Sequence, residues 1–252
     1  MKRSRRSAIA PFIAMEVLEA ANARAAVGES VLHLEVGEPA GGAPPAAIAA
    51  ARRLLEKPQA LGYTEALGIP PLRQRIAHHY LERYGVEVTP RDIAVTVGAS
   101  GAFVLAFLAA FDAGDRVARA VPGYPCYRNI LAALGIEPVV IETSLAEGFQ
   151  PTVAQLERLG RIDGLLLASP ANPTGTMLAP AALAELAQWC RERGVRIIAD
   201  EIYHGITYEK PESTILSFDR SAIVINGFSK YFCMTGWRLG WMVMPADLQE
   251  AV

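Results

Sequence analysis

The stretch AIVINGFSKYFCMTGWRLGWMVM (222–244) holds two short apolar runs, AIVIN (222–226) and GWMVM (240–244), on either side of a Gly-containing connection. Runs of this length and apolar content are typical of strands that are buried on both faces of a sheet. If the second run were parallel to the first, the chain would need a crossover of a dozen or more residues, usually a helix. The residues between the two runs leave no room for such a helix. We therefore expect strand 240–244, the last in the sequence, to run antiparallel.

Five more apolar runs of the same kind precede this stretch: IAVTV (93–97), RVARAV (116–121), PVVIET (138–143), GLLLAS (164–169) and RIIAD (196–200). Helix-like segments alternate with them, including AFVLAFLAAF (102–111), TVAQLERL (152–159) and PAALAELAQWCRER (180–193). Alternation of this kind predicts an α/β fold in which helices cover both faces of a mostly parallel sheet of about seven strands, a three-layer sandwich.

The part before Ile93 has a different composition. A helical arm comes first, then LHLEVGEPAGGAPPAA (32–47), which is rich in Gly and Pro, then a helix up to Leu55 and another after Pro70. We expect residues 1–55 to form an N-terminal arm and cap segment, and residues 56–252 to form one large ligand-binding domain.

The bulk composition indicates a globular protein with a small-molecule function. Of 252 residues, 52% are hydrophobic and 20% are charged, which suffices for a large core. A net charge of -2 argues against nucleic acid as the partner. Glu16 and Glu19 interrupt the first apolar run, so we expect neither a signal peptide nor a membrane span. The three cysteines are far apart, which favours a reducing cytoplasm over disulfides or zinc. The four histidines lack ligand spacing, so we expect no metal site.

Five segments place reactive or polar side chains at expected strand ends, where open α/β sheets bind ligands. They are VTVGASGAF (95–103), VPGYPCY (121–127), SPANPTGT (169–176), IIADEIYHG (197–205) and NGFSKYFCMTGWRLGW (226–241). Each has an ordinary structural interpretation as well: Ser100 as a helix N-cap, Tyr124 as a core residue, Asn172 as part of an Asn-Pro turn and Lys230 as a surface charge. Asp200 differs, because a carboxylate that ends an apolar strand needs a partner, and we expect a cationic one.

The ordered motifs GASGA (98–102), PGYP (122–125), NPTG (172–175), DEIY (200–203), GFSK (227–230) and GWRLG (236–240) resemble the class I/II aminotransferases. This family belongs to the pyridoxal-phosphate-dependent fold-type I group, which is typified by aspartate aminotransferase. The resemblance runs from about Gly37 to Pro245 and implies that Lys230 holds pyridoxal 5'-phosphate as a Schiff base. It also implies an amino-group transfer between an L-amino acid and a 2-oxo acid.

The resemblance implies a role for each matching residue. Asp200 pairs with the pyridinium nitrogen, Asn172 and Tyr203 hydrogen-bond the ring oxygen, and Tyr124 stacks on the ring. The phosphate group is bound by Ala99, Ser100, Ser229 and Arg238. Gly37 lies near the substrate carboxylate, as does Asn172, and Tyr63 reaches the phosphate of a neighbouring subunit, which implies a homodimer with a shared site. At Gly227 many members carry Ser or Thr, so one phosphate hydroxyl is expected to be missing here.

Elementary chemistry supports these residue types at such a site. An anion such as Asp200 keeps a proton on the ring nitrogen and so maintains the ring as an electron sink. Lys230, once displaced by the substrate amine, can act as a general base between Cα of the substrate and C4' of the cofactor. That task needs a neutral amine, which a desolvated site beside Arg238 favours.

Several alternatives stay open on the sequence. Family members are normally longer, and their C-terminal small domain carries an arginine for the substrate carboxylate; by the resemblance we expect this chain to lack that domain. A cofactor-binding or dimerisation module without turnover is therefore one alternative, and a fold-type I β-lyase or decarboxylase is another. A nicotinamide enzyme is disfavoured, because no G-x-G-x-x-G motif with an acidic partner follows the first strand. The amino acid substrate cannot be named from the motifs.

Overall fold

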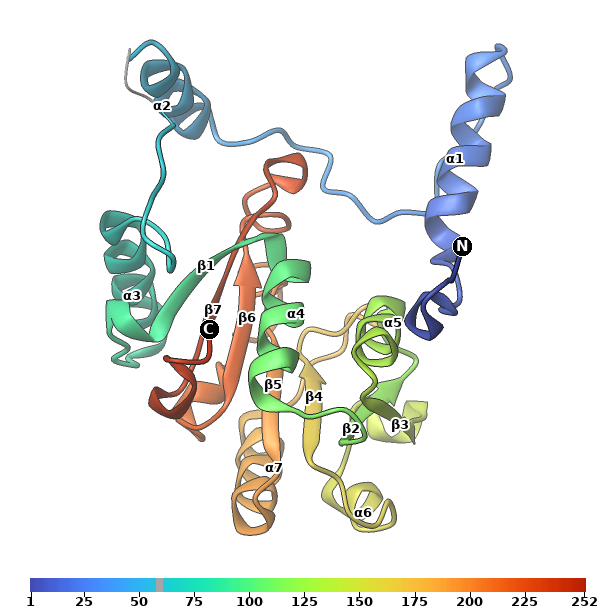
Figure 1. Cartoon of the computed structure of the whole chain (residues 1–252), viewed down its shortest axis with the longest axis vertical. Coiled ribbons are helices and arrows are strands. Elements are labelled where there is room, and N and C mark those ends of the chain that lie inside the picture. Colours follow the sequence, from blue (N-terminus) through green and yellow to red (C-terminus); the bar gives the residue numbers. More distant parts are fainter. Residues whose placement is uncertain (58–60) are drawn as a thin grey trace.

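Seven strands form a single mixed sheet in the computed structural model, which describes residues 1–57 and 61–252 (Figure 1). The strand order is β1-β7-β6-β5-β4-β2-β3. β7 pairs antiparallel with both β1 and β6, whereas the other neighbouring pairs are parallel. The predicted antiparallel last strand is thereby confirmed. The strands are β1 (Ile93–Val97), β2 (Arg116–Val121), β3 (Glu137–Glu142), β4 (Gly164–Ala168), β5 (Arg196–Asp200), β6 (Ile223–Gly227) and β7 (Leu239–Val243).

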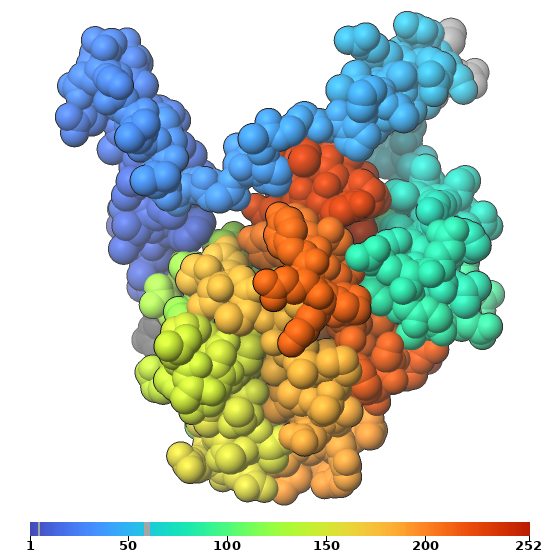
Figure 2. Space-filling model, turned by 180° about the vertical axis from the view of Figure 1, so that it is seen from behind, coloured from blue at the N-terminus to red at the C-terminus, as the bar shows by residue number. Residues whose placement is uncertain are grey.

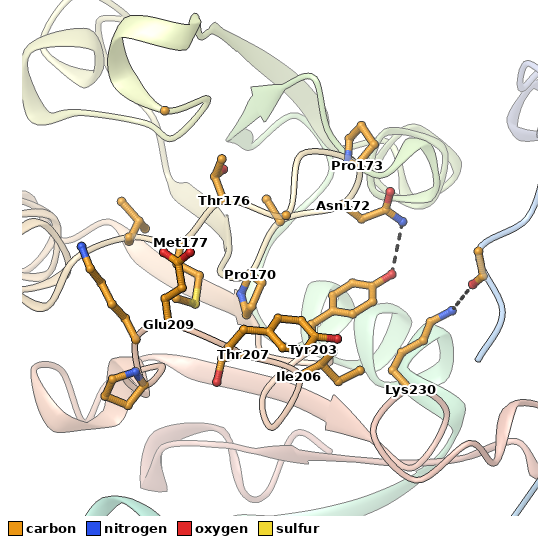
Figure 3. Close-up of a pocket in the computed structure, with 18 of the residues that line it drawn as sticks. Pro170, Asn172, Pro173, Thr176, Met177, Tyr203, Ile206, Thr207, Glu209 and Lys230 are labelled. Atoms are coloured by element: carbon orange, nitrogen blue, oxygen red, sulfur yellow. Dashed lines mark hydrogen bonds between the residues drawn. The ribbon is translucent and has the colours of Figure 1, made fainter. Parts of the chain in front are cut away.

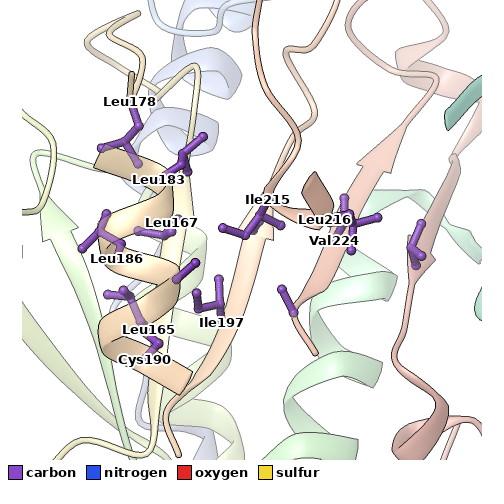
Figure 4. Close-up of a cluster of buried hydrophobic side chains, with 14 of the residues drawn as sticks. Leu165, Leu167, Leu178, Leu183, Leu186, Cys190, Ile197, Ile215, Leu216 and Val224 are labelled. Carbon is purple, nitrogen blue, oxygen red and sulfur yellow. The ribbon is translucent and has the colours of Figure 1, made fainter. Parts of the chain in front are cut away.

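Helices cover both faces of this sheet and bury two separate apolar clusters. The helices are α1 (Ile13–Ala26), α2 (Pro45–Leu55), α3 (Pro70–Tyr84), α4 (Gly98–Ala110), α5 (Pro125–Leu134), α6 (Val153–Leu156) and α7 (Pro180–Arg193). One cluster joins α3, α6 and α7 to one face of the sheet, and Figure 4 shows its part beneath α7. The other joins α4 and α5 to the opposite face. The chain is therefore the three-layer α/β sandwich that the sequence predicts.

Local sequence signals account for where several helices begin and end. Proline occupies the first turn of α2, α3, α5 and α7, where its missing N–H costs no helical hydrogen bond and its fixed φ suits the helix. Glycine with a positive φ follows three of these helices, at Gly85, Gly135 and Gly194. Each accepts the left-handed conformation that closes the last helical turn.

The N-terminal segment stands apart from this body. Neither α1 nor α2 contains a buried residue, and Figures 1 and 2 show both projecting away from the sheet. The arm touches α5 near its start, because the side-chain amide of Asn129 donates to the carbonyl of Ala10 at 3.3 Å and the ring of Phe12 packs edge-on against Tyr124. The division into an arm (1–55) and a large domain (56–252) stays a prediction.

Two predicted helices differ in extent from the observed ones. The predicted helix 152–159 is a single turn, α6, because the amides of Arg158 and Leu159 bond to carbonyls three residues back before Gly160 takes a positive φ. The helix predicted at 102–111 starts earlier, at Gly98, so the expected Gly-containing turn after β1 is almost absent. Strands β3, β4, β6 and β7 are shifted or shortened by one residue. In the part of the chain described, none of the helices has the length and apolar character to cross a membrane.

Candidate functional site

A cavity of about 460 Å³ lies at the carboxyl ends of the parallel strands, between the sheet and the N-terminal arm. Residues from distant parts of the chain meet on its wall. Every site residue expected from the sequence lines it except Tyr63: Gly37, Ala99, Ser100, Tyr124, Asn172, Asp200, Tyr203, Ser229, Lys230 and Arg238. The fold therefore brings together residues that come from six separate segments of the chain.

The start of α4 and the guanidinium of Arg238 form a positively charged cup in this cavity. Gly98, the first residue of α4, has a φ of +69°, and a Cβ atom there would overlap Nη2 of Arg238. Glycine is thus required for the guanidinium to lie against the helix start. Ala99 and Ser100 follow, where backbone N–H groups lack partners within the helix. Arg238 Nη1 donates to the carbonyl of Thr235 at 2.8 Å. The cup has the donors to hold a phosphate-sized anion.

Close packing of β6 and β7 beside the cup explains the glycine at position 227. A Cβ atom on Gly227 would lie 3.2 Å from Cα of Gly240 and 3.2 Å from the carbonyl oxygen of Leu239. A serine or threonine there would force the two strands to shift. The hydroxyl that we expected to be missing at this position therefore has no room beside the contact between the two strands.

Asp200 ends β5 and is buried, with an exposed fraction of 6%. Alternation along β5 places its side chain on the same face as Ile198, towards α4 and the cavity. The backbone N–H of Ile202 donates to Oδ1 at 3.0 Å, and the hydroxyl of Tyr127 donates to Oδ2. Burial raises the pKa of Asp200 to about 6, although both donors and the charge of Lys230 lower it.

The cationic partner that we expected for Asp200 is not a hydrogen-bonded side chain. Among the described residues no ion pair includes Asp200, and its two donors are neutral. A buried carboxylate can be satisfied by neutral donors at the expense of a raised pKa, which is the state found here. The open side of the carboxylate faces the cavity, where a cation can approach.

Tyr127 is a residue of this site that the sequence did not single out. It lies in the first turn of α5, is 4% exposed and packs against the rings of Tyr124 and Phe103. The motif VPGYPCY contains two tyrosines three residues apart, and this spacing puts both on one side of a helix start. That spacing was the available signal.

Tyr124 lines the same wall and is held between two rings. Phe12 packs edge-on at 5.8 Å between centroids and Tyr127 does so at 5.3 Å. Its backbone is extended, with φ of -61° and ψ of 121°, between Pro122 and Pro125. Burial raises the pKa of the Tyr124 hydroxyl above its usual value, so the ring is neutral at physiological pH. A flat group in the cavity could stack on it.

Asn172 and Tyr203 approach one another from separate segments. Asn172 Nδ2 donates to the hydroxyl oxygen of Tyr203 over a long distance of 3.4 Å, as the dashed line in Figure 3 shows. The amide of Asn172 and the hydroxyl of Tyr203 can both donate a hydrogen bond. An acceptor oxygen placed between them could therefore receive a hydrogen bond from each, in place of the long bond that they form with one another.

Lys230 follows β6 and is half-buried. Its Nζ donates to the carbonyl of Gly37 at 3.1 Å, and it lies 5.9 Å from the centre of the Tyr203 ring. Burial lowers the pKa of Lys230 and Arg238 acts in the same direction, whereas Glu38 and Asp200 raise it. The direction agrees with our expectation that the site favours a neutral amine.

A second, larger cavity of about 1120 Å³ opens from the first (Figure 3). The two cavities share Gly37, Glu38, Asn172, Tyr203 and Lys230. Ile206 lines the larger one, which extends towards Met177 and Glu209, and these two residues lie away from Lys230 in the figure. Lys230 thus stands at the junction, with a charged cup on one side and a mostly apolar space on the other.

Two further residues complete the account. Tyr63 is fully exposed and lines neither of these cavities. Glu38, which the sequence did not single out, accepts a hydrogen bond from the hydroxyl of Thr235 and so joins the arm to the loop that carries Lys230 and Arg238. In the part of the chain that the structure describes, no group of three or more His, Cys, Asp or Glu side chains has the arrangement to bind a metal ion.

Comparison with known proteins connects this arrangement to a family. A model of the family "Aminotransferase class I and II" matches residues 29–252. The chain is 49% identical to a valine--pyruvate aminotransferase of Mycobacterium tuberculosis over 250 residues, which cover 98% of this chain and 64% of the relative. It is 36% identical to an aspartate aminotransferase of Thermotoga maritima, with 94% of this chain and 64% of the relative covered.

Solved structures agree with the sequence relatives. A crystal structure of an aminotransferase from Mycobacterium tuberculosis superposes with a TM-score of 0.95 at 48% identity and covers 100% of this chain and 65% of that one. The aspartate aminotransferase of Thermus thermophilus with maleate also gives a TM-score of 0.95, at 32% identity, over 100% of this chain and 66% of the other. The chain spans about two thirds of the length of these relatives. With the match over residues 29–252 and the fold in agreement, the chain belongs to the aminotransferase class I and II family.

Proposed function

We propose that this chain is the cofactor-binding part of a pyridoxal-phosphate-dependent aminotransferase, in which Lys230 carries the cofactor. The single observation that supports this most is the shared cavity wall of Lys230, Asp200 and Arg238. An amine, a buried carboxylate and an anion cup are the three groups needed for the aldehyde, the ring nitrogen and the phosphate of this cofactor.

The described residues fit the cofactor on physical grounds. The cup at Gly98, Ala99 and Arg238 offers backbone donors and a guanidinium. Ser229 adds a hydroxyl on the same wall, and the ring of Tyr124 provides a stacking surface. Bound pyridoxal phosphate supplies an electron-withdrawing ring that stabilises negative charge at Cα of the substrate.

Each polar side chain then has a defined task. Asp200 would hold the proton on the ring nitrogen, because its open side faces the cavity and its charge is favoured by Tyr127 and Ile202. Asn172 and Tyr203 would donate to the ring oxygen. Lys230 would leave the Gly37 carbonyl, bear the cofactor and, when released by the substrate amine, move a proton between Cα of the substrate and C4' of the cofactor.

The substrates we propose are an L-amino acid and a 2-oxo acid. The larger cavity supports this, since its apolar lining around Met177 and Ile206 offers space for a side chain next to Lys230. Gly37 and Asn172, which lie at the junction of the two cavities, would bind the substrate carboxylate.

The proposal also includes a homodimer with a shared site and a location in the cytoplasm. Full exposure of the Tyr63 side chain supports the homodimer, because its hydroxyl is free to reach the anion cup of a neighbouring subunit, formed there by the start of α4 and Arg238. Helix α4 exposes Val104, Leu105 and Leu108, which offer apolar area for such a contact. The free thiols of Cys126, Cys190 and Cys233 suit a reducing compartment.

The test of the proposed reaction is a half-reaction followed by absorbance. The chain is loaded with pyridoxal phosphate and mixed with valine or aspartate, the amino acids in the relatives' names, and then with pyruvate. On addition of the amino acid, we expect the absorbance of the cofactor linked to Lys230 to fall, with stoichiometric release of a 2-oxo acid. On addition of pyruvate, the same absorbance should recover. Lys230→Ala should abolish the change. Release of ammonia or carbon dioxide instead would contradict amino-group transfer.

A further inference from the structure

His204 follows Tyr203 directly and lies on the side of β5 opposite the anion cup, with a side chain that is 3% exposed. Its Nε2 is 3.0 Å from the carbonyl oxygen of Ser169, and its Nδ1 is 2.8 Å from the hydroxyl oxygen of Tyr84. A carbonyl oxygen can only accept, so Nε2 carries the hydrogen and donates it. In the neutral ring Nδ1 is then the acceptor for the Tyr84 hydroxyl.

The surroundings favour this neutral tautomer. The ionisable groups that face the ring are Glu201, Tyr84, Arg83, Glu212 and His79. Burial lowers the pKa of His204 to about 4 and raises that of Glu201 to about 8, so both are neutral near pH 7. Arg83 and Glu212 neutralise one another in an ion pair.

Ser169 opens the segment that carries Asn172. This segment is a closed turn, since Ala171 N donates to Thr176 O at 2.9 Å and Gly175 N donates to Ala171 O at 2.7 Å. At Ser169 two hydrogen bonds join the turn to β5 and to the segment that follows it. The N–H of Ser169 donates over a long 3.4 Å to the carbonyl of Asp200, the last residue of β5, and His204 donates over 3.0 Å to the carbonyl of Ser169. The His204 bond therefore fixes the turn against the segment that carries Tyr203.

We infer that His204 is a positioning residue for the ring-oxygen site. By donating to Ser169 while it accepts from Tyr84 of α3, it holds Asn172 and Tyr203 at the spacing needed to donate to one oxygen of the cofactor. The inference rests on the proposed function, but its structural part, the anchoring of residues 169–176, can be measured without cofactor.

Three variants test the inference. His204→Phe keeps an aromatic ring and removes both hydrogen bonds. His204→Gln keeps an N–H donor that can reach the Ser169 carbonyl. His79→Phe is the matched control, because His79 packs edge-on against the same Tyr84 ring from α3, outside both segments. Thermal unfolding establishes first that each variant is folded.

The first readout is hydrogen–deuterium exchange of the unloaded protein. We expect residues 169–176 to exchange at least about tenfold faster in His204→Phe, since one anchoring bond is lost, and at the wild-type rate in His204→Gln and His79→Phe. The second readout is the pH titration of absorbance of the loaded protein. Donors to the ring oxygen favour its negative charge, so looser donors should raise the titration midpoint of the Lys230 linkage, by about one pH unit in His204→Phe.

The outcomes separate the two claims. If a folded His204→Phe protects residues 169–176 as the wild type does, or titrates at the wild-type midpoint, His204 is a packing residue and the inference fails. If His204→Phe does not fold, His204→Gln carries the test, and faster exchange there with a raised midpoint would equally overturn the role of the donor. If wild-type protein forms no linkage with pyridoxal phosphate, the proposed function fails, whereas the exchange data still decide the anchoring.

Discussion

Tyr127 donates its hydroxyl hydrogen to Oδ2 of Asp200 across the interface between α5 and β5. The bond joins two residues 73 positions apart in the chain, and both are buried. It orients the carboxylate and partly offsets the effect of burial on its pKa. The family motifs contain Asp200, but its charge in this chain depends on a tyrosine outside those motifs.

Removing that hydroxyl should weaken the site at neutral pH. In Tyr127→Phe the pKa of Asp200 rises further above about 6, so less carboxylate is present at pH 7 to hold the ring-nitrogen proton. We expect cofactor affinity to fall about tenfold at pH 7 and less at pH 8.5, where the carboxylate is ionised again. Fluorescence titration at the two pH values measures this.

Tyr80→Phe is the control for Tyr127→Phe. Tyr80 is also a fully buried tyrosine, and its hydroxyl accepts from Nε1 of Trp241 at 3.2 Å in the other apolar cluster. Tyr80→Phe should lower the free energy of unfolding by about 1 kcal/mol and should cause no pH-dependent change in the affinity for pyridoxal phosphate. Equal pH dependence in the two variants would contradict a specific role for Tyr127.

A methyl group on Gly98 should damage the anion cup. Gly98→Ala imposes strain at φ of +69° and pushes the Arg238 guanidinium from the start of α4. Gly114→Ala is matched to it, since Gly114 has φ of +98° but a Cβ there would meet no atom within 4 Å. Both should lose about 1 to 2 kcal/mol of stability, and only Gly98→Ala should lose affinity for pyridoxal phosphate, by tenfold or more. Similar affinity in both would argue against the cup.

Glu201 gives the stability of the chain a predictable pH dependence. Burial raises its pKa from 4.5 to about 8, so the folded state holds a proton that the unfolded chain releases between these values. Its contribution to stability is complete below pH 4.5 and is lost as the pH rises towards 8. The Glu201→Gln variant should not show this loss, and at pH 8 its free energy of unfolding should exceed that of the wild type by roughly 1 to 4 kcal/mol. Urea unfolding at pH 5 and pH 8 measures the free energy of unfolding of both proteins. If the difference between Glu201→Gln and the wild type is the same at the two pH values, Glu201 is not the group that causes the pH dependence.

A charge on the exposed face of α4 should oppose self-association. Leu108 is 59% exposed on α4, and Leu108→Glu should raise the dissociation constant of a dimer at least about tenfold, because a carboxylate would have to be desolvated there. Leu145→Glu serves as control, since Leu145 is 79% exposed in the 3-10 helix after β3. Sedimentation equilibrium measures the dimer dissociation constant of each variant. If Leu108→Glu and Leu145→Glu have the same dissociation constant, the interface does not include the exposed face of α4.

The strand pattern made most of the fold predictable. Runs such as GLLLA in β4 and IVI (223–225) in β6 are apolar because both faces of the sheet are covered, and the positions of these strands were correct within one residue. Element ends were less predictable. The early stop of α6 depends on backbone bonds to carbonyls three residues back, and no pattern in TVAQLERL indicates it.

The site was predictable where motifs carry it and not where tertiary packing does. Asp200, Lys230 and Arg238 stand in recognisable motifs and meet on one wall. Tyr127 and His204 act through partners 73 and 35 positions away, at Asp200 and Ser169, and such contacts exist only once β5 lies beside β4 and α5 covers the sheet. The sequence does not identify these partners, although the spacing of Tyr124 and Tyr127 does place both tyrosines on one side of a helix start.

The proposed function depends on covalent attachment of pyridoxal phosphate to Lys230, which can be measured as the mass of the protein after reduction. Wild type, Lys230→Ala and Lys210→Ala are incubated with pyridoxal phosphate and reduced with borohydride; Lys210 lines the larger cavity and is the control for chance adducts. We predict one reduced cofactor per chain in wild type and Lys210→Ala and none in Lys230→Ala, and after digestion the adduct should be on the peptide that contains Lys230. An adduct that persists in Lys230→Ala, or the absence of an adduct on the wild-type chain, would show that Lys230 does not carry the cofactor.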